Sequence, residues 1–417
     1  MTDQLKPLIR DLMAENSRVN PRVAQRFWYP LSVATYDSDE VMEAIDSMCS
    51  FRTTMGDKTR RFEEAFGAQF GGEAIMVNSG SSADLLIAFS LLEESGGPLK
   101  AGDEIIVPAV TWPTQLWSAL MAGFDVRLAD VSPQTLNVDF EALESCLTEK
   151  TRGLSLVHLM GNPADMSQAV EFCRDHNLIL IEDCCESLGA QWQGQHVGTF
   201  GYASSFSFFF SHHMTTMEGG MIMTSDSDLA ERFRTLRAHG WSRNLQNGVP
   251  SFPGLDPRYT FVGWGFNVRP TELQAGFGLV QLGRLPEFTH NRAESVRAFQ
   301  GEISEIRPYI RLMDVPPEAV CSWFALPLIV EEACPLSRDE ITSYLEENGV
   351  ETRPIVAGNL LAQPAVSAFN RISGGPLPGA EIIHANGFYI GLHPTGDVEP
   401  VRRVGALLVD MVKRFVY

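Results

Sequence analysis

Residues 74–92 read Ala-Ile-Met-Val-Asn-Ser-Gly-Ser-Ser-Ala-Asp-Leu-Leu-Ile-Ala-Phe-Ser-Leu-Leu and decide the fold of this chain. The apolar run 74–77 predicts a buried strand, and the run 85–92 predicts a helix. The small residues 78–83 between them predict a tight turn into the helix, where backbone amides and the helix dipole can bind an anion. A simple helix N-cap would give the same pattern without any ligand.

Three further apolar runs extend this pattern along the chain. Residues 104–108, 153–159 and 178–182 predict buried strands, and residues 168–176 predict a helix between the last two. Alternating strands and helices indicate βαβ units, so we expect an α/β fold with a mostly parallel sheet flanked by helices. Ligands of such sheets bind at the carboxyl ends of the strands, where the polar residues that follow these runs fall.

The pattern divides the chain into three parts. Residues 1–40 read as an N-terminal extension with one helix over 5–15, and residues 41–285 as the large domain. After Leu285 a long amphipathic helix, 292–303, is followed by shorter strand-like runs such as 323–330. We therefore expect a smaller C-terminal α/β domain over 286–417, with an internal loop at 374–379.

Composition and charge limit the classes of function that this chain can have. The chain has 417 residues, 44% of them hydrophobic, which is enough for two packed domains. A net charge of −20 opposes binding to nucleic acid or to an anionic membrane surface. No apolar run approaches the roughly 18 residues that span a bilayer, and the N-terminus lacks a signal-peptide pattern, so we predict a cytoplasmic protein. Seven cysteines show neither zinc-site spacing nor a disulfide framework.

Nine ordered motifs carry a resemblance to a known family. The chain resembles the fold-type I, pyridoxal-phosphate-dependent sugar aminotransferase and dehydratase family from about residue 29 to 408, and is most similar to its branch of GDP-4-keto-6-deoxymannose 3-dehydratases. The resemblance implies an aminotransferase-like fold. The motifs lie at 77–82, 102–112, 159–163, 182–189, 211–220, 237–243, 265–270, 322–324 and 353–359.

The most informative departure is a missing lysine. In this family a lysine seven residues before the first glycine of Glu-Gly-Gly binds the cofactor covalently, whereas this chain has His212 there and no lysine from 151 to 412. Imidazole can carry a proton near neutral pH, so we expect His212 to be the catalytic acid and base and the cofactor to be held non-covalently. His213 would point to the opposite face of a strand and reads as structural. The pair lacks a nearby third ligand for a metal.

The resemblance also assigns the phosphate of pyridoxal or pyridoxamine 5'-phosphate. It implies that the amides of Gly80 and Ser81 and the hydroxyl of Ser207 bind this phosphate. Asn267 matches an asparagine that reaches the phosphate from the partner subunit. The resemblance therefore implies a homodimer with an active site shared across the interface.

Three residues are assigned to the cofactor ring. Asp183 ends a buried strand, where an unpaired carboxylate is costly, and the resemblance pairs it with the protonated pyridine nitrogen. Glu186 matches a dehydratase glutamate at the ring hydroxyl edge, and Trp112 matches an aromatic residue that stacks on the ring. Alternatively, Asp183 could cap a helix or form an ion pair, and Trp112 could simply pack in the core.

Five residues are assigned to the sugar nucleotide. Arg243, Arg269 and Arg353 lie in matched motifs, and guanidinium groups suit phosphate oxygens, although each could equally form a surface ion pair. His239 and Trp241 are expected to line the pocket near the sugar.

The expected reaction is removal of the C3 hydroxyl from a nucleotide-linked 4-keto-6-deoxy sugar. Glutamate would supply the amine as pyridoxamine phosphate, and the products would be a 4-keto-3,6-dideoxy sugar and ammonia. A related branch carries an iron–sulfur cluster, but residues 242–264 contain no cysteine to bind one. A nucleotide-sugar 4-aminotransferase and a non-catalytic homologue remain as alternatives.

Overall fold

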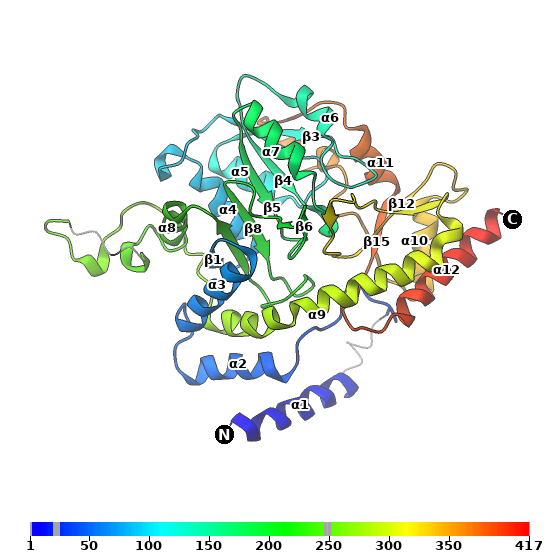
Figure 1. Cartoon of the computed structure of the whole chain (residues 1–417), viewed down its shortest axis with the longest axis horizontal. Helices are drawn as coiled ribbons and strands as arrows, with labels where there is room; N and C mark the ends of the chain where they lie inside the picture. Colours follow the sequence, from blue (N-terminus) through cyan, green and yellow to red (C-terminus); the bar gives the residue numbers. More distant parts are fainter. Residues whose placement is uncertain (1, 20–25, 246–247, 249–251, 417) are drawn as a thin grey trace.

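The computed structural model describes residues 2–19, 26–245, 248 and 252–416 (Figure 1). Its centre is an eight-stranded sheet in the order β1-β9-β8-β5-β4-β2-β3-β14. All neighbouring strands run parallel except the β1/β9 and β9/β8 pairs, so the expected mostly parallel sheet is confirmed. The strands are β1 (Glu73–Val77), β2 (Glu104–Pro108), β3 (Asp125–Ala129), β4 (Thr151–Val157), β5 (Ile179–Asp183), β8 (Ala203–Ser207), β9 (Gly220–Thr224) and β14 (Ile372–Gly374).

Helices cover both faces of this sheet because its central strands are apolar on both sides. In β2, Ile105 and Val107 pack into the core under α4 (Gly80–Ser90) and α5 (Thr114–Ala122), whereas Ile106 packs into the core under α7 (Met166–Asp175). The predicted helix at 168–176 is α7, and the predicted helix at 85–92 is the later part of α4. The helices of the large domain are α3 (Asp57–Phe70), α4 (Gly80–Ser90), α5 (Thr114–Ala122), α6 (Phe140–Leu143), α7 (Met166–Asp175) and α8 (Ser227–Leu236).

The longest helix, α9 (Glu272–Glu302), connects the two halves of the chain (Figure 1). It begins at a capping box made by Thr271 and Gln274 and continues through Pro286 to Glu302. The expected change of structure after Leu285 is therefore wrong in one respect, because the helix crosses that position unbroken. Its buried residues lie on both sides of Pro286, so both halves pack on the same helix.

The C-terminal part forms a second, antiparallel sheet in the order β10-β12-β15-β13. The segment 374–379 is only partly the expected loop, because β14 ends at Gly374 and α11 begins at Pro378. β14 joins the large sheet beside β3, so the chain returns to the first sheet from the C-terminal part. The elements are β10 (Ile310–Leu312), β12 (Leu326–Val330), β13 (Thr352–Pro354), β15 (Gly387–Ile390), α10 (Arg338–Glu347), α11 (Pro378–Asn386) and α12 (Glu399–Val416).

The N-terminal segment begins with α1 (Thr2–Val19), which includes the predicted helix at 5–15 and packs on α2 (Ser38–Cys49). Residues 20–25 of the predicted extension lie outside the described residues. A small three-stranded sheet is formed by β6 (Gln191–Trp192), β7 (Gln195–His196) and β11 (Ala319–Val320). Among the described helices, none has the length and apolar character needed to cross a membrane.

Candidate active site

A cavity of about 520 Å³ lies where β4, β5 and β8 end and α4 begins. This is the edge of the sheet at which the sequence predicts a ligand. The cavity brings together eight of the predicted site residues, which are Gly80, Ser81, Trp112, Asp183, Glu186, Ser207, His212 and Arg353.

One end of the cavity is the turn into α4. The Ser79 side chain caps the helix by accepting a hydrogen bond from the amide of Ser82, which explains why α4 starts earlier than the apolar run. The amides of Gly80 and Ser81 precede the first intrahelical bond of α4. A Cβ atom on Gly80 would lie 2.7 Å from the Ser207 Cβ atom, so only glycine lets the turn approach the end of β8 this closely. Two free amides beside a hydroxyl suit a phosphate group.

Asp183, which also lines the cavity, is the last residue of β5. Its Oδ1 atom accepts a hydrogen bond of 2.8 Å from the amide of Cys185, and Gln115 provides a second bond. Burial raises the pKa of Asp183 above its ordinary value, although these hydrogen bonds and the nearby His158 oppose the rise. A cation placed beside this carboxylate would stabilise its charged form, as a protonated ring nitrogen would.

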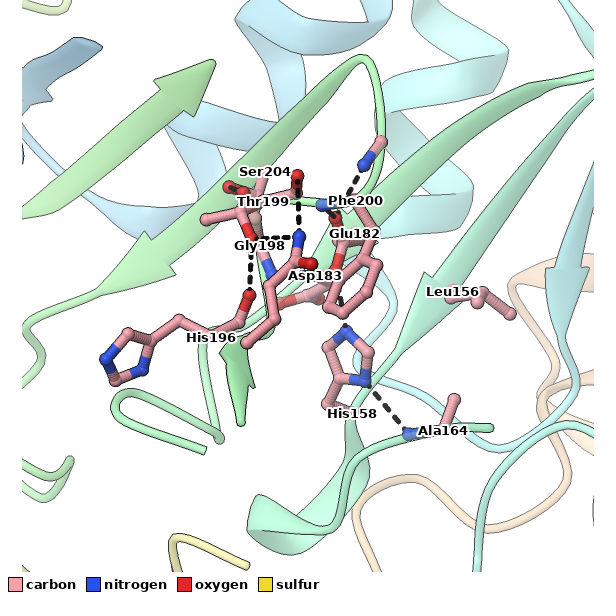
Figure 2. A network of polar contacts seen from close by, with 12 residues as sticks. Leu156, His158, Ala164, Glu182, Asp183, His196, Gly198, Thr199, Phe200 and Ser204 are labelled. Carbon is pink, nitrogen blue, oxygen red and sulfur yellow. Dashed lines mark hydrogen bonds and ion pairs between the residues drawn. The ribbon is translucent and has the colours of Figure 1, made fainter. Parts of the chain in front are cut away.

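A buried network fixes the strand end that carries Asp183 (Figure 2). Glu182 accepts hydrogen bonds of 2.6–2.8 Å from the amides of Gly198, Phe200 and Gly201. The amide of Ala164 donates to Nδ1 of His158, so Nε2 carries the proton and donates to Glu182 at 3.3 Å.

Glu186 also lines the cavity. Its Oε2 atom accepts a hydrogen bond of 3.0 Å from the amide of Met160. Burial raises the pKa of Glu186 to about 7, and the charge of Asp183 adds to this effect. Trp112, which follows β2, also lines the cavity and keeps 59% of its surface exposed. Its ring is therefore free to cover a flat ligand.

His212 lies in the loop between β8 and β9, not on a strand as the sequence suggested. Its Nδ1 atom is 2.8 Å from the carbonyl oxygen of Cys185. Because a carbonyl oxygen can only accept, Nδ1 carries the proton and Nε2 keeps a free lone pair. The ring also packs edge-to-face on Phe324, with 5.1 Å between centroids.

Burial lowers the pKa of His212 to about 4, and the charge of Arg292 contributes to this effect. The sequence alone led us to expect protonation near neutral pH, which the structure corrects. At neutral pH the imidazole is uncharged and can accept a proton at Nε2.

His213 points away from the cavity, as expected, although the two histidines lie in a loop. Its Nε2 atom is 2.8 Å from the carbonyl oxygen of Ser322, and the side chain is buried. The buried guanidinium of Arg292 donates to the carbonyl oxygens of His212 and His213, both at 3.3 Å. The backbone that carries His212 is thus held in place from α9.

The other five predicted residues do not line this cavity within one chain. Arg269 donates to the Asn267 side chain at 2.9 Å, and Arg243 lies over the Trp241 ring at 5.2 Å. His239 is exposed, with a positive φ of 64°. All five residues belong to the segment between α8 and α9, part of which projects from the body of the protein (Figure 1). Its last part returns to the body, where the carbonyl oxygen of Val268 accepts a hydrogen bond from the amide of Asn78. Their roles, including that of Asn267 across a subunit interface, stay predictions.

The structure adds cavity residues that the sequence analysis did not single out. Phe324 and Tyr389 come from the C-terminal part and could not be placed from local patterns. Asp84 also lines the cavity. The sequence does contain an indication that Asp84 is unusual, because it is the single charged residue in the apolar helix α4.

Comparisons with known proteins agree with this geometry. Residues 35–409 match the DegT/DnrJ/EryC1/StrS aminotransferase family. The chain is 37% identical to a GDP-4-keto-6-deoxy-D-mannose 3-dehydratase of Yersinia pseudotuberculosis, over 91% of this chain and 98% of that protein. It is 34% identical to the solved E. coli enzyme of that name with bound hydrated PLP, with a TM-score of 0.87 over 92% and 99% of the two chains.

A second structure of a dehydratase of that name contains a trapped PLP-glutamate geminal diamine. It is 34% identical, with a TM-score of 0.87, and covers 91% of this chain and 100% of its own. Sequence and structure lead to the same conclusion: this chain belongs to the DegT/DnrJ/EryC1/StrS aminotransferase family.

Proposed function

We propose that this chain is a pyridoxamine-phosphate-dependent 3-dehydratase of a nucleotide-linked 4-keto-6-deoxy sugar, with GDP-4-keto-6-deoxymannose as the first candidate substrate. One observation carries the proposal. His212 occupies the position of the cofactor lysine, and its Nδ1–H···O bond to Cys185 leaves Nε2 free as a base at the cavity. A chain with this arrangement can transfer protons but cannot bind the cofactor covalently there.

The relatives support the substrate and the amino donor. Two curated relatives, at 37% and 36% identity, are GDP-4-keto-6-deoxy-D-mannose 3-dehydratases. A solved dehydratase, a histidine-to-asparagine variant 34% identical to this chain, contains bound GDP-perosamine. Together with the PLP-glutamate adduct in another structure, these support a GDP-sugar as the substrate and glutamate as the source of the amine.

The residues present fit the cofactor. The amides of Gly80 and Ser81 with the Ser207 hydroxyl would hold the phosphate, and Asp183 would bind the ring nitrogen. When bound, the cofactor supplies an amine and a ring that withdraws electrons. Glu186 would accept or donate a hydrogen bond at the ring hydroxyl, and the Trp112 ring would cover one face.

His212 would then move the protons of the reaction. As a neutral imidazole it accepts a proton at Nε2, and the resulting imidazolium can donate that proton to the hydroxyl leaving C3 of the sugar. The low pKa favours this second step, because a buried imidazolium gives up its proton readily. Fixed by Cys185, Phe324 and the Arg292-bound backbone, the ring delivers the proton at one position.

The proposal includes a homodimer whose sites are completed by Asn267 of the neighbouring copy, and diphosphate or sugar contacts from Arg353 and the projecting segment with Arg243. The exposed positions of Asn267 and Arg243 support this, since both side chains are available to a second chain. The composition favours a cytoplasmic reaction.

The test is a product analysis. Purified protein is incubated with glutamate, pyridoxal phosphate and a panel of nucleotide-linked 4-keto-6-deoxy sugars, and the products are analysed by mass. A 3-dehydratase removes the C3 oxygen without adding nitrogen. A 4-aminotransferase would instead retain nitrogen in the sugar, and a non-catalytic homologue would change no sugar and bind no cofactor.

A further inference from the structure

Asp84 lies in the second turn of α4 and lines the cavity beside Asp183. One carboxylate oxygen of each residue and the Cys185 sulfur lie within 4.8 Å of one another. The Ser205 hydroxyl donates a hydrogen bond to Asp84. The cavity therefore has two carboxyl groups, not one, at the end where Asp183 would meet the ring nitrogen.

The surroundings of the two carboxyl groups offer little to neutralise them. A space of about 20 Å³ next to Asp84 is lined mainly by apolar side chains, with Gln115, Ser118 and Ser155 as its neutral polar groups, and its described lining contains no lysine or arginine. His158 is the basic group near Asp183, and it already donates to Glu182. The titratable groups near the pair include His158, Glu182, Cys184, Cys185, Glu186 and His212, and Glu218, Arg353 and Tyr389 line the same cavity. The guanidinium of Arg353 forms an ion pair with Glu351 at 2.7 Å.

Two ionised carboxylates this close in a buried place repel each other. Burial raises the pKa of Asp84 well above its ordinary value, and the charge of Asp183 adds to the rise. Burial also raises the pKa values of the Cys184 and Cys185 thiols, so both thiols are neutral. Two negative charges on this pair are therefore unfavourable in the cofactor-free protein.

We propose that Asp84 is a positioning residue for the cofactor ring. The Asp84–Asp183 pair holds one proton in the cofactor-free protein, and Asp84 loses that proton to solvent when the positively charged ring nitrogen binds beside Asp183. The site then has two carboxylates next to one cation. The inference rests on the proposed function in that the cavity must bind this cofactor.

The variant Asp84→Asn tests whether Asp84 releases a proton when the cofactor binds. Asparagine keeps the size of the side chain and can still accept the hydrogen bond from Ser205, but it has no proton to release. Because binding that releases a proton strengthens as pH rises, the wild-type affinity should rise with pH up to the raised pKa of Asp84. This rise of cofactor affinity with pH should be absent in Asp84→Asn.

The experiment is calorimetric titration of cofactor-free protein with pyridoxamine phosphate in buffers of different ionisation enthalpy. Below the raised pKa of Asp84, the wild type should release about one proton more per site than Asp84→Asn. At the upper end of the pH range, the affinity of the wild type for pyridoxamine phosphate should exceed that of Asp84→Asn by about tenfold. Asp84→Ser serves as a second acid-free variant, and thermal unfolding shows that each variant is folded.

Equal proton counts and parallel pH dependences in wild type and both variants would overturn the inference and leave Asp84 a structural acid. No sugar is present in these titrations, so failure of the dehydratase assay alone would overturn the proposed reaction and not the role of Asp84. Failure of the wild type to bind pyridoxamine phosphate would overturn both.

Discussion

At the scale of single residues, His212 decides the chemistry through one hydrogen bond. The 2.8 Å contact from Nδ1 to Cys185 sets the tautomer and leaves Nε2 as the free base. Its buried place lowers its pKa, which makes the ring a proton acceptor at neutral pH. A lysine at this position would place a nucleophilic amine in the cavity.

We therefore expect His212→Lys to bind pyridoxal phosphate covalently, with the yellow absorbance of the adduct, and to lose dehydration by at least about a hundredfold. Absorbance spectra and product mass measure the two effects. His212→Asn is the matched control, because it removes the base without adding an amine and should lose dehydration without covalent attachment. A lysine variant that still forms the 3-deoxy product at the wild-type rate would refute the role of His212.

Glu186 provides a second residue-scale prediction, on stability. Its pKa is about 7 in the folded protein and near 4.5 in the unfolded chain, so the folded state binds the extra proton. Between pH 4.5 and 7 the unfolded chain ionises while the folded protein keeps its proton, so raising the pH lowers wild-type stability relative to Glu186→Gln. The difference should reach about 3 kcal/mol above pH 7 and vanish below pH 4.5.

Denaturant unfolding of the cofactor-free protein at a series of pH values measures this difference. Glutamine keeps an oxygen that can accept the Met160 amide, so the comparison isolates the charge. A constant difference in the free energy of unfolding between Glu186→Gln and wild type across this pH range would show that burial does not raise the pKa of Glu186.

At the scale of elements, the turn from β1 into α4 depends on how closely it approaches β8. The would-be Cβ atom of Gly80 lies 2.7 Å from Cβ of Ser207, below any normal contact. An added methyl group must push the α4 amides and the Ser207 hydroxyl apart. Both groups are assigned to the same phosphate, so separating them should weaken binding of the whole cofactor.

Gly80→Ala should weaken pyridoxal phosphate binding by about tenfold or more, as measured by fluorescence or absorbance titration. Gly283→Ala is the matched control, since an added Cβ meets nothing within 4 Å at that position in α9. It should leave binding unchanged and stabilise the helix by about 0.5–1 kcal/mol. Equal affinities for the two variants would count against a phosphate site at this turn.

At the scale of the whole molecule, the site is built from distant parts of the chain. The large sheet supplies Asp183 and Ser207, the C-terminal part supplies Phe324 and Tyr389, and α9 holds the His212 backbone through Arg292. Asn267, in contrast, is exposed and lies outside the cavity of its own chain. A shared site in a dimer would give this residue its phosphate contact.

Subunit mixing tests that arrangement. His212→Asn and Asn267→Ala should each be nearly inactive alone, because each homodimer lacks one part of both sites. Unfolding and refolding an equal mixture should restore about a quarter of wild-type dehydration, since half of the dimers then contain one complete site. Co-expression with two different tags gives the same heterodimer without refolding. Mixed dimers as inactive as their parents would exclude a shared site.

The sequence by itself determined four strands of the large sheet (β1, β2, β4 and β5), the turn at Gly80 and the absence of a cofactor lysine. These depend on local periodicity and on the chemistry of single side chains, which the sequence contains directly. Only the tertiary structure decided that α9 continues through Pro286, that β14 returns to the large sheet and that Asp84 lies beside Asp183. It also lowered the pKa of His212, because burial and pairing depend on residues far apart in the chain.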